Sequence, residues 1–149
     1  MNNEKLKCCP VCDGDLIEET RTISTNYKNI SFEFSQPGRW CSECGEGFLT
    51  PKDLDSSKRD IADNKRIIEH RLKSDEIKKF RKKEKLTQKQ AGEIFGGGAN
   101  AFSKYERGEI IQSKSTDVLM RLVKSKKITI EDIKKIEEKA KNETDIVYG

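Results

Sequence analysis

The sequence of 149 residues is poor in hydrophobic residues, which make up 33% of it, whereas Asp, Glu, Lys and Arg make up 38%. Glycine and proline are not enriched either, with 10 and 3 residues. This composition is too polar for a single large core, yet it holds too much Ile, Leu and Phe for a wholly disordered chain. We therefore expect two small domains, one of which needs a stabilising link besides its core.

Long apolar runs are also lacking. No stretch approaches the roughly 18–20 apolar residues that cross a bilayer, and the first residues, MNNEKLKCC, lack the apolar stretch of a signal peptide. These absences lead us to expect a cytoplasmic protein. In that compartment thiols stay reduced, so paired cysteines indicate a metal site rather than a disulfide.

Histidine is nearly absent, since His70 is the single one. It lies in a charged stretch in which we expect neither a metal nor a catalytic role for it. No Ser-His-Asp, Cys-His or paired-carboxylate site can be assembled around it. The sequence therefore predicts a protein that is not an enzyme, and we assign no catalytic residues.

The net charge of +4 is unevenly distributed along the chain. Residues 1–50 carry a net charge of −3, residues 51–73 carry +2, residues 74–127 carry +7 and residues 128–149 carry −2. The basic middle segment indicates a polyanionic partner for this part of the chain. The alternative is that these Lys and Arg side chains only solvate helix faces.

The N-terminal third has the character of a small β domain. Residues 6–50 contain all five cysteines and the single Trp, and the stretch 21–35 alternates apolar and polar residues, which predicts two short antiparallel strands. The Pro-Gly pair predicts a turn over residues 36–40. We set the boundaries of this zinc-binding domain at 1–50 and expect residues 51–73 to form a charged, partly helical linker.

The remainder, residues 74–149, predicts an all-α domain of five helices. They begin at Ile77, Gln88, about Ala99, Ser115 and Thr129. For the second helix, Thr87 is the expected N-cap and Gln90, three residues on, completes a capping box. Gly96 is expected to end that helix in the left-handed conformation. The fold class expected for the whole chain is therefore α+β.

The cysteines form two C-x2-C pairs separated by 28 residues, which is the pattern of a structural zinc site. The expected ligands of one zinc ion are Cys9, Cys12, Cys41 and Cys44. Cys8 is left over, because a ligand there would change the spacing to C-x3-C. Gly45 follows the second pair, where φ > 0 turns backbone N–H groups toward the sulfurs, and we expect the turn at Asp13 to differ.

A helix-turn-helix is suggested by LTQKQAGEIFGGGANAFSKYERG, residues 86–108, which resembles the helix-turn-helix of the phage-repressor (Cro/C1, or XRE) family. The triple glycine departs from that family. Together, the CxxC…CxxCG pattern and IFGGGANAFSKYERG resemble the MqsA (YgiT-type) antitoxin family of bacterial toxin–antitoxin systems. This resemblance implies a homodimer through the C-terminal domain, operator binding by that domain, and an N-terminal zinc domain that binds an mRNA-cleaving toxin.

The resemblance also implies roles for individual residues. Asn100 and Lys104 are the implied base readers, since Asn pairs with adenine and Lys with guanine in the major groove. The family more often has Arg where this chain has Lys104, which alters the hydrogen-bonding fork. The expected phosphate contacts are Thr87, Gln88 and Arg107. Arg81 and Glu106 match a buried ion pair of the wider repressor family.

Two other functions remain open from the sequence. The first is a stand-alone transcriptional regulator, of host or phage origin, without a toxin. The second is a zinc-ribbon factor associated with RNA, against which the acidic charge of residues 1–50 counts.

Overall fold

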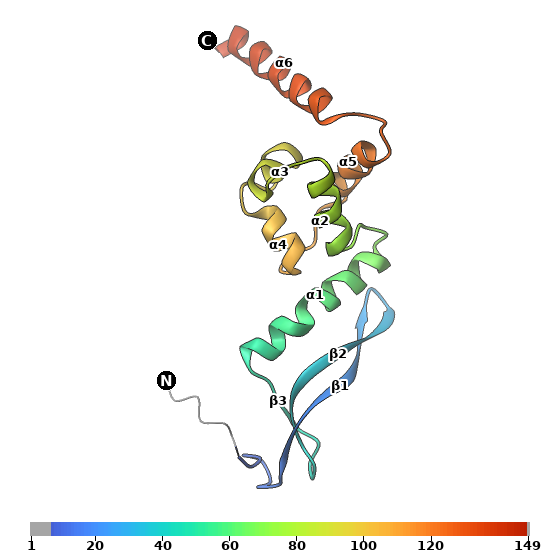
Figure 1. The fold of residues 1–149 in the computed structure, drawn as a ribbon, viewed down its shortest axis with the longest axis vertical. Helices are drawn as coiled ribbons and strands as arrows, with labels where there is room; N and C mark the ends of the chain where they lie inside the picture. The colour runs from blue at the N-terminus through green and yellow to red at the C-terminus, as the bar shows by residue number, and fades with distance from the viewer. Residues whose placement is uncertain (1–6, 149) are drawn as a thin grey trace. The chain divides into compact units, whose positions relative to one another are not determined.

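We describe a computed structural model, in which residues 7–148 are described and the chain divides into two compact units at the Ile68–Glu69 bond (Figure 1). The N-terminal unit holds the β-sheet and one helix, and the C-terminal unit holds five helices. The α+β fold class predicted from the sequence is thus confirmed. Within residues 7–148, no helix combines the length and the apolar character that crossing a membrane requires.

The sheet of the N-terminal unit consists of β1 (Leu16–Tyr27), β2 (Ile30–Cys41) and the short β3 (Gly47–Phe48), antiparallel in the order β1-β2-β3. The two long strands form one hairpin, in register from Leu16 opposite Cys41 to Tyr27 opposite Ile30. Its tight connection is Lys28-Asn29, with φ of 48° and 64°, as a twisted two-residue hairpin loop requires.

The turn expected over residues 36–40 is wrong, because Pro37 and Gly38 lie inside β2. A two-residue loop makes Tyr27 and Ile30 a hydrogen-bonded pair, and such pairs alternate along the ladder. Thr20 opposite Pro37 is therefore a non-hydrogen-bonded pair, at which Pro37 has no N–H to supply to β1. The missing donor costs the hairpin nothing, and the strand continues through the Pro-Gly pair.

Helix α1 (Pro51–Ile68) packs against β2 within the N-terminal unit. Its second turn is tied to the strand by the Ser57 hydroxyl, which donates to Oε1 of Gln36 over 2.7 Å, and the Gln36 amide donates to the Asp53 carbonyl. The sequence analysis expected a partly helical linker here. The helix is present, but it packs through the small side chains of Ser57 and Ala62, which an apolar pattern does not reveal.

The C-terminal unit consists of α2 (Ser74–Lys83), α3 (Gln88–Phe95), α4 (Ala101–Arg107), α5 (Lys114–Lys124) and α6 (Ile130–Tyr148). A chain of ring contacts joins α2, α3 and α4, with centroid distances of 5.4 Å for Phe80–Phe95 and 5.9 Å for Phe95–Phe102. The other buried apolar residues of this core are Leu72, Ile77, Ala91, Ala101, Tyr105, Met120, Val123 and Ile133. The core therefore fixes α4 against α3.

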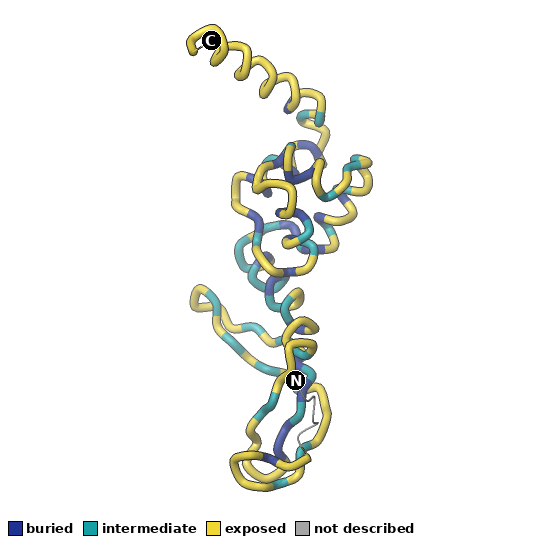
Figure 2. Tube along the Cα trace, turned by 90° about the vertical axis from the view of Figure 1, so that its left-hand side faces the viewer, coloured by how far each residue is buried: buried dark blue, intermediate teal, exposed yellow. Residues whose placement is uncertain are grey.

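Helix α6 is mostly outside this core. It runs away from α2–α5 in Figure 1, and Figure 2 shows it exposed along nearly all of its length. Ile133 is its single buried residue among those described.

Candidate metal centre and DNA-binding surface

Two tight turns of the N-terminal unit bring four cysteine sulfurs together. The Sγ atoms of Cys9 and Cys44 are 3.7 Å apart, those of Cys12 and Cys41 are 3.4 Å apart, and all four lie within 4.8 Å of one another. A tetrahedral zinc site with Zn–S bonds of about 2.3 Å has sulfur–sulfur edges of about 3.8 Å. The cluster therefore has the size and donor set to hold one metal ion.

The two turns have the same local geometry. The N–H of Asp13 donates to the Cys9 carbonyl over 2.8 Å, and the N–H of Gly45 donates to the Cys41 carbonyl over 3.0 Å. Asp13 and Gly45 have φ of 61° and 76°. The expectation that the Asp13 turn would differ is wrong, because Asp13 adopts positive φ and makes the same hydrogen bond as Gly45, although it is not glycine.

Backbone N–H groups point toward the sulfurs, as expected for thiolate ligands. Val11 donates to Cys9 Sγ over 3.4 Å, and Glu43 donates to Cys41 Sγ over 3.4 Å. A Cβ at Gly14 would lie 3.0 Å from Sγ of Cys41 and 2.6 Å from Cγ of Glu43, so a side chain there would crowd the cluster. The turns are thus arranged around the sulfurs.

The four thiols influence one another's ionisation. The backbone N–H of Cys44, followed by that of Glu43, lowers the pKa of Cys41 to about 6. At Cys12 the backbone N–H of Gly14 acts to lower the pKa, but hydrogen bonding to Cys41, burial and the other two thiols together raise it to about 12. A metal cation at the centre stabilises all the thiolates at once, which is why such a cluster favours metal.

Cys8 lies outside the cluster. It is exposed, and its backbone forms an isolated antiparallel bridge with Asp15. This placement agrees with its role as the cysteine that the C-x2-C spacing leaves over.

In the C-terminal unit, α3, a glycine turn and α4 form the predicted helix-turn-helix. The N-terminus of α3 has the predicted capping box: the Gln90 N–H donates to the Thr87 hydroxyl over 3.1 Å, and the Thr87 N–H donates to the Gln90 side chain over 2.9 Å. Gly96 caps the other end with φ 92° and ψ 170°. It is thus at positive φ but outside the left-handed helical region that the sequence analysis expected, because the chain leaves α3 extended.

The glycine turn approaches α3 so closely that a side chain does not fit. A Cβ at Gly92 would lie 1.9 Å from the carbonyl oxygen of Gly98. The sequence analysis assigned no role to Gly92. The triple glycine elsewhere in the motif was the available signal, since two glycine-containing segments can approach backbone to backbone.

Asn100 and Lys104 are both exposed, at the start and on the outer surface of α4. Asn100 occupies the N-cap position, but its side chain makes no capping hydrogen bond. Since residues four apart lie on one helix face, the two side chains can reach the same groove. Asn100, Lys104 and the exposed Arg107 therefore lie on one short element.

The predicted phosphate contacts differ in their surroundings. The Arg107 guanidinium donates to the Ser103 carbonyl and pairs with Glu109 over 3.2 Å. The Thr87 side chain is engaged in the capping box. Gln88 is half-buried, and its amide donates to Oε2 of Glu106 over 2.8 Å. This link from α3 to α4 was not foreseen from the sequence.

Glu106 accepts hydrogen bonds from both Gln88 and Arg81. Its carboxylate accepts from Nε of Arg81 over 2.6 Å, and the side chains of Arg81 and Glu106 are 11% and 7% exposed. Arg81 also donates to the Leu86 carbonyl over 3.0 Å. The predicted ion pair is present, and Gln88 extends it so that α2, α3 and α4 share one polar contact.

Comparison with known proteins agrees with this two-part arrangement. The family described as the antitoxin component of bacterial toxin–antitoxin systems, MqsA, matches residues 6–134. Antitoxin MqsA of Escherichia coli (strain K12) is 33% identical over 118 residues, which cover 77% of this chain and 90% of that protein. The family match over residues 6–134 includes both the four-cysteine cluster and the helix-turn-helix. The chain belongs to the MqsA family of antitoxins, which are regulatory proteins and not enzymes.

Proposed function

We propose that this antitoxin binds operator DNA of its own operon through the C-terminal unit, as a homodimer, and neutralises an mRNA-cleaving toxin through the N-terminal unit. The observation that carries the DNA-binding part is the exposure of Asn100 and Lys104 on α4, whose opposite side is fixed to α3 by buried aromatic rings. A rigid helix with two polar side chains on one face suits base reading in the major groove.

The charge of the chain supports this division of labour. Residues 74–127 carry a net charge of +7, which suits the phosphate backbone of DNA. Residues 1–50 carry −3, which is unsuited to nucleic acid and suits a basic protein partner. We assign Thr87, Gln88 and Arg107 to phosphate contacts and propose that Gln88 also aligns α3 with α4 through Glu106.

We further propose that the metal at Cys9, Cys12, Cys41 and Cys44 is a single structural zinc ion. Four sulfur donors at tetrahedral separations favour zinc, and a fully sulfur-ligated site has no open position for a reacting water. The role of the ion is to hold the two turns together at the base of the hairpin. Because operator DNA, the toxin and the mRNA that the toxin cleaves would all be met in the cytoplasm, we propose that the protein acts there.

The experiment combines a reporter with a growth assay. A reporter gene is placed behind the DNA immediately upstream of this gene, and the neighbouring reading frame is expressed as the toxin candidate. Full-length protein should repress the reporter and restore growth, whereas a chain of residues 69–149 should repress the reporter without restoring growth. Loss of repression with an intact C-terminal unit contradicts the DNA-binding assignment, and restored growth contradicts the toxin-binding assignment.

A further inference from the structure

The last helix carries apolar side chains that no other residue among 7–148 covers. Helix α6 continues to Tyr148, beyond the family match, which ends at residue 134. Ile136 is 69% exposed, Ile146 84%, Val147 71% and Tyr148 86%. Exposed apolar side chains gathered on one helix mark an interaction surface more often than a solvated one.

One face of α6 carries an ordered stripe, to which Ile136 and Val147 belong and Ile146 and Tyr148 do not. Ile133 is buried in the core of its own chain, and Ile136, Ala140 and Val147 follow at intervals of three, four and seven residues. Such spacing places them on one helix face, so the face that buries Ile133 continues outward into solvent. Glu143 falls between Ala140 and Val147 on the same face. An apolar stripe interrupted by one carboxylate is the result.

Helix α5 carries a second apolar surface, a groove whose one charged residue is basic instead of acidic. Its lining is Lys114, Ser115, Val118, Leu119 and Leu122, and Val118 and Leu122 are 45% and 37% exposed. In the part of the chain that the structure describes, no residue of α6 lines this groove. The groove thus combines uncovered apolar side chains with one cation.

The position of Lys114 is unfavourable for the helix itself. It is the first residue of α5, where the helix dipole disfavours a positive charge. Within residues 7–148, neither Lys114 nor Glu143 forms an ion pair. A partner charge brought to Lys114 from outside the chain would offset this cost.

We propose that the outer half of α6 of one chain docks antiparallel in the α5 groove of a second copy. In this register Glu143 meets Lys114, Ala140 meets Val118, and Ile136 meets Leu122. The spacings agree, because the groove positions are four and four residues apart and the stripe positions are three and four apart. The small Ala140 faces a bulkier side chain, and antiparallel helices also align their dipoles favourably.

The docking is reciprocal by symmetry. In a two-fold dimer, each contact occurs twice, so each chain supplies one stripe and one groove. The exchange covers both apolar surfaces and sets the distance between the two α4 helices, which must match two operator half-sites. This inference rests on the homodimer of the proposed function and names the surface that forms it.

The test is a charge exchange in the full-length protein, followed by sedimentation equilibrium. Lys114→Glu and Glu143→Lys each place like charges together, so each should raise the dimer dissociation constant by about tenfold or more. The double variant Lys114→Glu/Glu143→Lys restores opposite charges and should return the constant to about the wild-type value. Both positions are exposed, so circular dichroism of every variant should match that of the wild type.

The matched control exchanges charge elsewhere. Lys127→Glu and Glu138→Lys carry the same charge changes, with Glu138 on the opposite face of α6 from Ile136, and both should leave the dissociation constant unchanged. Single variants without effect, or a double variant no better than the singles, overturn the docking register while a wild-type dimer stands. A wild type that sediments as a monomer overturns the homodimer of the proposed function itself.

Discussion

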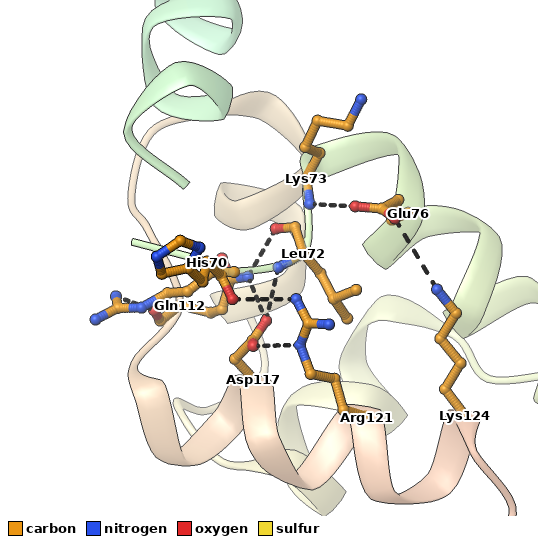
Figure 3. A network of polar contacts seen from close by, with 9 residues as sticks. His70, Leu72, Lys73, Glu76, Gln112, Asp117, Arg121 and Lys124 are labelled. Atoms are coloured by element: carbon orange, nitrogen blue, oxygen red, sulfur yellow. Dashed lines mark hydrogen bonds and ion pairs between the residues drawn. The ribbon is translucent and has the colours of Figure 1, made fainter. Parts of the chain in front are cut away.

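The backbone N–H of Leu72, in the segment before α2, donates to Oδ1 of Asp117 on α5 over 2.8 Å (Figure 3). The Gln112 amide donates to the Leu72 carbonyl over 2.8 Å and to the same Asp117 oxygen over 3.1 Å. Arg121 donates to the other Asp117 oxygen over 2.8 Å and to the His70 carbonyl over 3.1 Å. Leu72 itself is 1% exposed. The segment that precedes α2 is therefore an integral part of the C-terminal unit.

The first prediction follows from this anchor. A chain of residues 69–149 should have a free energy of unfolding about 2–5 kcal/mol higher than that of a chain of residues 74–149, because the shorter chain lacks the Leu72 side chain. The shorter chain also leaves the buried Asp117 without its backbone donor. The urea midpoint of the longer chain should be higher accordingly. Urea unfolding of both fragments measures the difference. Leu72→Ala in the full-length chain should reproduce most of the loss, and equal midpoints for the two fragments would contradict the anchor.

The second prediction concerns the metal ligands. Cys9→Ser or Cys44→Ser should lose bound metal and unfold the turns, because ligation supplies much of the folding free energy of so small a domain. Cys8→Ser is the matched control and should keep one metal ion per chain, since Cys8 lies outside the cluster. Elemental analysis of the purified variants checks this. Full metal in Cys9→Ser together with loss in Cys8→Ser would reverse the ligand assignment.

The sequence predicted some features of the N-terminal unit and missed others. The cluster of four cysteines followed from C-x2-C spacing alone, because local turn geometry places both sulfurs of a pair. The long hairpin did not follow, since Pro37 and Gly38 look like a turn unless the hydrogen-bonding alternation of the strands is known. The packing of α1 was also hidden, because small side chains such as Ala62 make it. Sites that depend on the spacing of neighbouring residues can be predicted from the sequence, whereas contacts of small residues across long distances in the chain cannot.

The third prediction addresses the glycine turn. Gly92→Ala should destabilise the C-terminal unit by about 1–3 kcal/mol or more, because the new Cβ overlaps the Gly98 carbonyl oxygen and the backbone must move. Gly98→Ala, at φ 86° and with no atom within 4 Å of the added Cβ, should cost only the backbone term of about 1–2 kcal/mol. Thermal unfolding ranks the two. Glu93→Ala, exposed on the same helix, is the control, and a smaller effect for Gly92→Ala than for Gly98→Ala would refute the contact.

The fourth prediction is a pH dependence at the start of α6. The Thr129 N–H donates to Asp132 over 2.8 Å, and this bond, followed by the Thr129 hydroxyl contact, lowers the pKa of Asp132. A lowered carboxyl pKa contributes stability above the ordinary value of about 3.9, and this stability is lost as the pH falls through the lowered value. Asp132→Asn should therefore speed amide exchange of Ile133 at pH 7, and the difference should vanish in acid. Asp145→Asn, which lies far from the start of α6, should change neither the exchange rate of the Ile133 amide at pH 7 nor its dependence on pH.

The last prediction separates base reading from phosphate binding and from alignment of the helices. Asn100→Ala should weaken operator binding by about 1–3 kcal/mol and leave binding to scrambled duplex nearly unchanged, because one bidentate base contact is lost. Lys104→Ala should do the same if it reads a base. If Lys104 instead neutralises a phosphate, both duplexes weaken and the slope of log affinity against log salt falls by about 0.9.

Gln88→Ala is the third member of this set, and the structure gives it two possible signatures. As a phosphate ligand it should weaken operator and scrambled duplex equally, since phosphate carries no sequence information. Because Gln88 also joins Glu106 to α3, Gln88→Ala should lower the thermal stability of the protein without DNA, since the nearly buried Glu106 carboxylate loses one donor. Titration against both duplexes at two salt concentrations, with thermal unfolding of each free variant, distinguishes these roles. Equal loss for both duplexes on Asn100→Ala would remove α4 as the reading helix, whatever Gln88 does.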